Sequence, residues 1–125
     1  MTLDEINEAY VGASSYPEIV RNLIALGVES YTVDSATDIT IFRFAGGKTL
    51  TRSSNSVSRT PAAEFDRSEV RNAIVANQTG GSDFQGFMDH IARAGVRFYE
   101  ATLIGDNKRV EYFGVGDSHI EAIPV

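Results

Sequence analysis

Two histidines, His90 and His119, are the only side chains in the chain whose ordinary titration lies near neutral pH. His90 falls at the flank of an apolar stripe with helical spacing, which is typical of a half-exposed helix residue. His119 and Glu121 share one face of an alternating segment, and that spacing suits two metal ligands. No third ligand with metal-like spacing accompanies them, so the sequence predicts no metal site and no cofactor.

Motifs for nucleophilic catalysis and phosphate binding are missing. The chain has no cysteine and no Gly-x-Ser-x-Gly motif. The glycine-rich run at 114–117 joins two predicted strands, so no helix N-terminus is available there to receive a phosphate. We therefore expect no catalytic residue, although enzymatic activity stays open as an alternative.

One carboxylate, Glu100, stands in a segment otherwise suited to burial. Facing a pocket, it would exchange protons or hydrogen bonds with a ligand. Facing solvent, it would pair across strands with Lys108 or Arg109. The first reading, together with the sequence repeat described below, makes Tyr31, Tyr99 and Glu100 candidate ligand-binding residues.

Aromatic side chains gather on the predicted strands. They are Tyr31, Phe42, Phe44, Phe98, Tyr99, Tyr112 and Phe113. Such residues most simply form the core, but some of them would equally suit a ligand groove or a dimer interface.

Basic residues cluster in one part of an acidic chain. The net charge is −6, which argues against non-specific binding to nucleic acid or to an anionic membrane. Arg43, Lys48, Arg52 and Arg59 nevertheless follow one another with no acidic residue between them. They are candidate contacts for a partner or an anion, or else charges that protect an edge strand from pairing with another chain.

Composition and length predict one domain, residues 1–125. With 42% hydrophobic residues the chain can form a core without disulfides. No apolar run approaches the roughly 20 residues that cross a bilayer. The first residues lack the basic start and apolar centre of a signal peptide. We therefore expect a cytoplasmic protein.

Capping residues and apolar stripes predict four helices. They begin after Thr2, Ser15, Asp66 and Asp83. Gly27 and Gly95 end the second and the fourth, as glycines suited to left-handed caps do. Alternation and turn signals predict strands over 28–33, 39–44, 48–52, 96–103, 109–115 and 118–123.

The segment 16–31 recurs at 84–99 with coinciding apolar positions. Gly27 falls on Gly95, and Tyr31 falls on Tyr99. The chain is therefore predicted to be an α+β domain of two tandem helix-helix-strand-strand-strand repeats, with an antiparallel sheet and two helical hairpins. The half-repeats cover about 1–52 and 65–125, and a flexible, polar linker joins them over about 53–64.

The order of these segments also resembles a known family. The opening at 3–10, the starts at 16–18 and 83–84, the helix at 65–78 and the helix-to-strand junctions at 26–28 and 94–96 are similar to the YbcV-like family of small bacterial proteins. That family is a domain of unknown function, numbered 1398 and sometimes labelled phage envelope protein. The resemblance implies an α+β fold and supplies no catalytic or binding residues.

Three functions stay open. The first is a non-catalytic domain that binds a small molecule or a protein, as a monomer or homodimer, and contacts neither nucleic acid nor membrane. The second is a small enzyme or ligand sensor with a pocket at the seam between the repeats. The third, which comes only from the family label, is a phage-derived structural protein.

Overall fold

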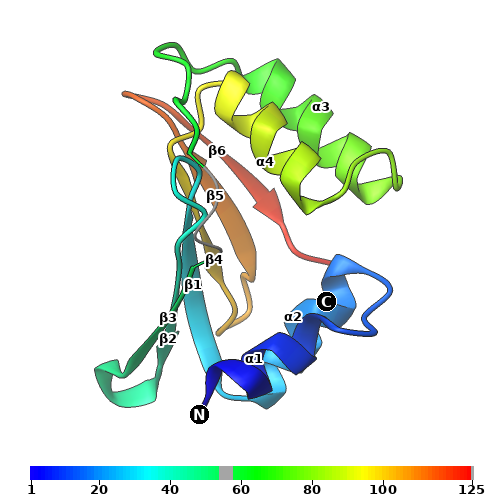
Figure 1. Ribbon diagram of the computed structural model, residues 1–125, viewed down its shortest axis with the longest axis vertical. Coiled ribbons are helices and arrows are strands. Elements are labelled where there is room, and N and C mark those ends of the chain that lie inside the picture. The colour runs from blue at the N-terminus through cyan, green and yellow to red at the C-terminus, as the bar shows by residue number, and fades with distance from the viewer. Residues whose placement is uncertain (54–57, 125) are drawn as a thin grey trace.

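A computed structural model describes residues 1–53 and 58–124 of the chain and shows a two-layer α+β fold (Figure 1). One layer is an antiparallel six-stranded sheet in the order β3-β2-β1-β4-β5-β6. Its strands are β1 (Val28–Asp34), β2 (Thr40–Phe44), β3 (Thr49–Arg52), β4 (Phe98–Thr102), β5 (Arg109–Phe113) and β6 (Ser118–Ala122).

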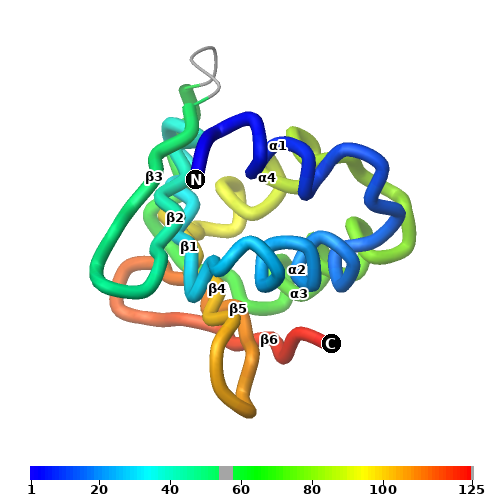
Figure 2. The backbone as a smooth tube through the Cα atoms, turned by 90° about the horizontal axis from the view of Figure 1, so that it is seen from below, coloured from blue at the N-terminus to red at the C-terminus, as the bar shows by residue number. Residues whose placement is uncertain are grey.

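The second layer consists of two helical hairpins on the same face of the sheet (Figure 1, Figure 2). The helices are α1 (Leu3–Tyr10), α2 (Tyr16–Ala25), α3 (Arg67–Gln78) and α4 (Phe84–Arg93). The pair α1–α2 lies toward one end of the sheet and the pair α3–α4 toward the other (Figure 1). After β6 the chain turns to the helix side of the sheet in both views.

Each helix begins at the capping residue that the sequence predicts. The Thr2 side chain accepts from the Glu5 amide and Glu5 bonds back, which completes a capping box. At α2, α3 and α4 the side chains of Ser15, Asp66 and Asp83 each accept from the backbone amide three residues further on. These caps satisfy amide groups that would otherwise lack partners at the helix starts.

The helix-facing side of the sheet has two rows of side chains that cross all six strands. The first row reads Arg52, Thr40, Val33, Tyr99, Tyr112 and His119. The second reads Leu50, Phe42, Tyr31, Ala101, Val110 and Glu121. Because successive strand residues point to opposite faces, the residues between these positions face away from the helices.

The core lies between these rows and the inner faces of the helices. Leu23 of α2, and Met88 and Ile91 of α4, are fully buried against the sheet, as is Phe42 within it. Phe87 contacts both Tyr99 and Tyr112 edge-on, with ring centroids 6.3 and 6.4 Å away. Burial of these large side chains stabilises the layered arrangement by about 1.5–3 kcal/mol each.

The structure confirms the predicted α+β class with its antiparallel sheet and helical hairpins. Both halves have the order helix, helix, strand, strand, strand. Internal duplication of the sequence remains a prediction, as do the single domain and its half-repeats.

The linker prediction covers 53–64, and residues 54–57 of it lie outside the described part of the chain. In the described part, the Arg59 amide donates to the Ala36 carbonyl at 2.9 Å, and the Ala62 amide donates to the Ala92 carbonyl at 2.9 Å. The end of the linker is thus bonded to both halves. No helix over residues 1–53 and 58–124 has the length and apolar character needed to span a bilayer.

Candidate functional site

A cavity of about 540 Å³ lies on the helix side of the sheet. Its floor is formed by side chains of the two rows, including Val33, Thr40 and Val110. The start of α2 and the loop before it form one wall, and the end of α3 with the start of α4 forms another. Residues 122–124, where β6 ends, complete the lining.

All five tyrosines of the chain line this cavity. Tyr31, Tyr99 and Tyr112 come from the sheet, whereas Tyr10 and Tyr16 come from α1 and α2. Tyrosine combines a large apolar ring with one hydroxyl that both donates and accepts a hydrogen bond. The cavity is therefore mainly apolar, with a few polar groups at fixed positions.

The tyrosine hydroxyls differ in their partners. The hydroxyls of Tyr16 and Tyr31 are hydrogen-bonded to each other at 2.5 Å. Those of Tyr99 and Tyr112 have no hydrogen-bond partner among the described residues, although the two residues are only 8% and 6% exposed. Ser82 Oγ alone, in the described chain, is a side-chain polar atom both fully buried and unpartnered. The hydroxyls of Tyr99 and Tyr112 must therefore retain contact with open space, and both residues line the cavity.

Among the described residues, two charged side chains line the cavity, Arg52 and Glu121. The Arg52 guanidinium lies over the Tyr10 ring at 4.4 Å and near the Phe42 ring at 5.3 Å from their centroids. Such stacking holds the guanidinium plane in place by cation–π attraction. On the far edge strand, Glu121 Oε1 accepts a hydrogen bond from His119 Nε2 at 3.3 Å.

Burial raises the pKa of every tyrosine in the cavity. For Tyr31 and Tyr99, neighbouring tyrosines raise the pKa further. For Tyr10, burial outweighs the nearby Arg52, which by itself would lower the pKa. The five phenols are therefore neutral throughout the physiological pH range and act as hydrogen-bonding groups.

These shifts predict the alkaline behaviour of the protein. We expect absorbance at 295 nm, which reports phenolate, to stay low past pH 10, the ordinary pKa of tyrosine. Each folded pKa is raised, so the neutral phenols stabilise the fold fully below the unfolded pKa. That contribution is lost as the pH rises from the unfolded pKa toward the folded values. Ionisation should therefore coincide with loss of the circular dichroism signal.

A parallel titration in concentrated urea provides the control, because unfolded tyrosines should ionise near their ordinary pKa. Ionisation of one or more tyrosines near pH 10 with the circular dichroism spectrum intact would contradict the prediction.

The structure places Tyr31 and Tyr99 in the cavity, as the sequence-based hypothesis requires, but it does not bring Glu100 to them. Glu100 lies on the open face of the sheet, directly opposite Glu111 of β5. Strand alternation is the reason, since Glu100 follows the inward-facing Tyr99. The carboxylate that lines the cavity is Glu121.

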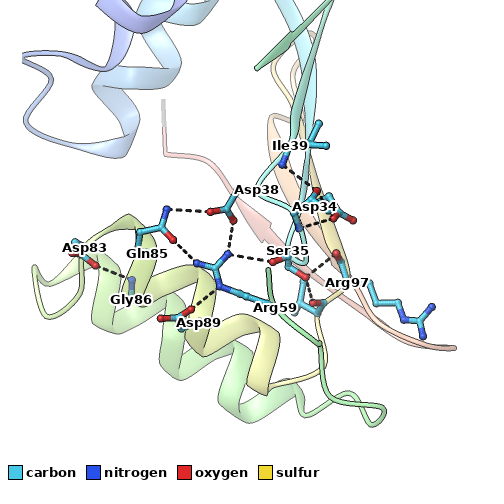
Figure 3. Close-up of polar contacts among 12 residues, drawn as sticks. Asp34, Ser35, Asp38, Ile39, Arg59, Asp83, Gln85, Gly86, Asp89 and Arg97 are labelled. Carbon is cyan, nitrogen blue, oxygen red and sulfur yellow. Dashed lines mark hydrogen bonds and ion pairs between the residues drawn. The ribbon is translucent and has the colours of Figure 1, made fainter. Parts of the chain in front are cut away.

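The four basic candidates do not form one surface. Arg52 lines the cavity, whereas Arg43 donates to Thr32 Oγ1 at 2.6 Å across the adjacent strand. Lys48 is exposed beside the β2–β3 turn. Arg59 is bonded to Asp38, Asp89 and Gln85 within the protein (Figure 3).

Sequence reasoning missed Tyr10, Tyr16 and Glu121 as lining residues, and it named Tyr112 only among the strand aromatics that would suit a groove. A usable signal did exist. Every tyrosine in the chain is on the apolar stripe of a helix or on the inward-facing positions of a strand, and Glu121 is on the inward face of β6. Five inward-facing tyrosines bring five hydroxyls into the space between the helices and the sheet. Each of these hydroxyls needs either a hydrogen-bond partner or contact with open space.

Within the described residues, no group of three or more histidine, aspartate or glutamate side chains could hold a metal ion. A family model described as "Protein of unknown function (DUF1398)" matches residues 5–122. The chain therefore belongs to this family. A search of curated proteins finds no match.

Proposed function

We propose that this member of the DUF1398 family is a non-catalytic protein that binds a small, largely apolar organic molecule in the tyrosine-lined cavity. The observation that carries the proposal is the cavity of about 540 Å³ lined by all five tyrosines. Sites for small ligands typically have volumes of about 300–1,000 Å³ and apolar walls with a few oriented polar groups.

The unpartnered hydroxyls of Tyr99 and Tyr112 support the view that the cavity binds a ligand and is not simply a packing defect. Both residues are over nine-tenths buried, and their hydroxyls, which keep contact with the open space of the cavity, have no hydrogen-bond partner among the described residues. Such groups cost free energy unless a ligand or ordered water hydrogen-bonds to them. A ligand with a hydrogen-bond donor or acceptor beside Tyr99 and Tyr112 would supply partners for both hydroxyls.

The raised tyrosine pKa values favour binding over catalysis. A general acid or base works best when its pKa is close to the ambient pH. Phenols held neutral by burial hydrogen-bond well but transfer protons poorly near neutral pH. An enzyme or a sensor with this cavity as its site remains the alternative.

A protein partner or a homodimer is the second candidate. The Phe98 and Phe113 rings stack with centroids 4.8 Å apart on the open face of the sheet, and Phe98 is 38% exposed. This apolar pair lies beside the charged Glu100 and Glu111, so the surrounding face is polar. The cavity therefore has the stronger support. A cytoplasmic location and a phage-related role remain predictions.

The proposal is tested with N-phenyl-1-naphthylamine, an uncharged aromatic dye that fluoresces in apolar sites. Wild-type protein should bind it, and Ala13→Trp should weaken binding about tenfold or more by filling space beside the lining residue Ala13. Val11→Trp is the matched control, because Val11 is in the same loop, is 78% exposed and is not a lining residue. The chain has no tryptophan, so each variant carries a single tryptophan, whose fluorescence can be excited selectively over that of the tyrosines.

Equal binding by Ala13→Trp and wild type would contradict the proposal, as would failure of wild type to bind the dye. Native mass spectrometry of gently purified protein adds an independent test, in which a co-purifying small molecule supports the proposal.

A further inference from the structure

We propose that the molecule bound in the cavity carries an anionic oxygen group and that Arg52 binds this group. The inference rests on the proposed function of the cavity and adds the chemical class of its ligand, an aromatic or similarly apolar organic anion. The two charged lining residues, Arg52 and Glu121, and their partners indicate this class of ligand.

Arg52 is a charged residue without an acidic partner. No carboxylate among the described residues lies within ion-pair distance of it. Its Nη1 donates to Asn7 Oδ1 at 3.3 Å, and a further hydrogen bond with the Tyr10 side chain acts to lower the pKa of that phenol. A guanidinium has five N–H donors in its plane, so several remain unused. The Tyr10 and Phe42 rings lie against the guanidinium, so a polar ligand group can reach it through the N–H donors at its edge.

Two of the nine arginines in the chain form ion pairs with carboxylates among the described residues. Arg59 pairs with Asp38 and Asp89, and Arg67 pairs with Asp117 at 2.6 Å. Arg52 has no such carboxylate among the described residues, and what distinguishes it from the other unpaired arginines is its place in the lining of the cavity. A stacked guanidinium with a free donor edge matches carboxylate, sulfonate or phosphate oxygens.

The remaining lining groups place no negative charge beside Arg52, so an anion is the ligand group that fits at this end of the cavity. Glu121, the one acidic residue in the described lining, accepts a hydrogen bond from His119. The tyrosines are held neutral by burial, so none of them supplies a negative charge. The cavity therefore has a positive charge at its β3 edge, neutral hydrogen-bonding groups on β4 and β5, and its negative charge, Glu121, on β6 at the opposite edge of the sheet.

The test compares two dyes with the same aromatic skeleton. 1-Anilinonaphthalene-8-sulfonate carries a sulfonate, and N-phenyl-1-naphthylamine does not. Arg52→Gln should weaken binding of the sulfonate dye about tenfold or more, since a charge-assisted hydrogen bond is lost, and should change binding of the neutral dye less than about twofold. Arg52→Lys should give an intermediate loss, because it keeps the charge but not the planar fork.

Arg43→Gln is the matched control and should leave both affinities unchanged. Arg43 occupies the neighbouring strand β2 but is bonded to Thr32 and is absent from the lining. Circular dichroism and thermal melting check that every variant is folded. Because a weakened fold would expose apolar surface to both dyes, the ratio of the two affinities is the quantity compared.

Three results would overturn the inference. An unchanged affinity of Arg52→Gln for the sulfonate dye shows that Arg52 does not bind the anion. Equal losses for both dyes show that Arg52 only shapes the cavity. In both cases the proposed function stands if wild type binds the neutral dye and Ala13→Trp does not. If the wild-type protein binds neither of the two dyes, both the proposed function and the inference are wrong.

Discussion

Replacing Arg59 with methionine should lower the free energy of unfolding by about 3–5 kcal/mol, because the change leaves a buried carboxylate without its counter-charge. The Arg59 side chain is only 7% exposed and that of Asp38 only 1%. Arg59 Nη1 contacts Asp38 Oδ1 at 2.5 Å, and Nε contacts Asp89 Oδ1 at 2.6 Å. Urea denaturation monitored by circular dichroism measures the loss.

The arrangement of the partners explains the size of the effect (Figure 3). Gln85 accepts from Arg59 Nη2 through Oε1 at 2.5 Å and donates through Nε2 to Asp38 Oδ2 at 3.1 Å. The Ser35 carbonyl accepts from Arg59 Nη1 at 3.3 Å. The guanidinium thus connects the end of the linker, the β1–β2 turn and α4 in one network, whose removal leaves several polar groups unpaired.

Arg67→Met provides the control, because Arg67 and Asp117 form an ion pair of similar length whose side chains are 44% and 48% exposed. Exposed pairs contribute about 0–1 kcal/mol. The double variant Asp38→Asn/Arg59→Met should recover part of the loss, since no charge is then left buried. A loss at Arg59 no greater than that at Arg67 would show that the network is not a structural anchor.

This network also bears on the cavity. Gln85 belongs to the first turn of α4, between Phe84 and Phe87, and both phenylalanines line the cavity. Asp38 precedes Thr40, a lining residue on the floor. By joining α4 to the β1–β2 turn, Arg59 fixes the distance between a wall and the floor. Arg59 was a candidate for binding a partner, yet its donors serve this internal purpose.

Local signals made the elements predictable. Thr2, Ser15, Asp66 and Asp83 cap the helices in the structure because a short polar side chain before an apolar stripe satisfies free amides in any fold. The strands appear where alternation and turn residues predict them, with ends that differ by up to two residues. These signals depend only on neighbours in the chain.

The candidate site was less predictable, because it depends on which distant faces meet. Tyr31 and Tyr99 were identified from the repeat, since corresponding inward positions on β1 and β4 converge when those strands pair. Glu100 was assigned to the same site although it follows Tyr99 directly and so faces the other side. Tyr16 reaches the site only because α2 packs over β1, which no local pattern specifies.

Replacing Gly95 with alanine should lower the free energy of unfolding by about 3–5 kcal/mol, which combines a left-handed backbone with overpacking. Gly95 follows α4 and has φ of +89°. An added Cβ would lie 2.1 Å from the Glu64 carbonyl oxygen and 2.8 Å from Phe65 Cα. These are backbone atoms where the linker joins the second half, so they can yield only if this junction moves away from Gly95.

Gly27→Ala separates the two causes. Gly27 corresponds to Gly95 in the first half and has nearly the same φ, +91°, but its added Cβ would meet nothing within 4 Å. The free energy of unfolding of Gly27→Ala should therefore fall by only about 1–2 kcal/mol, the cost of a left-handed backbone conformation for alanine. The difference between the two variants, measured by urea denaturation, is the free-energy cost of displacing the linker at Glu64 and Phe65. Equal losses would mean that the linker rearranges freely, and that only the backbone conformation requires glycine at both junctions.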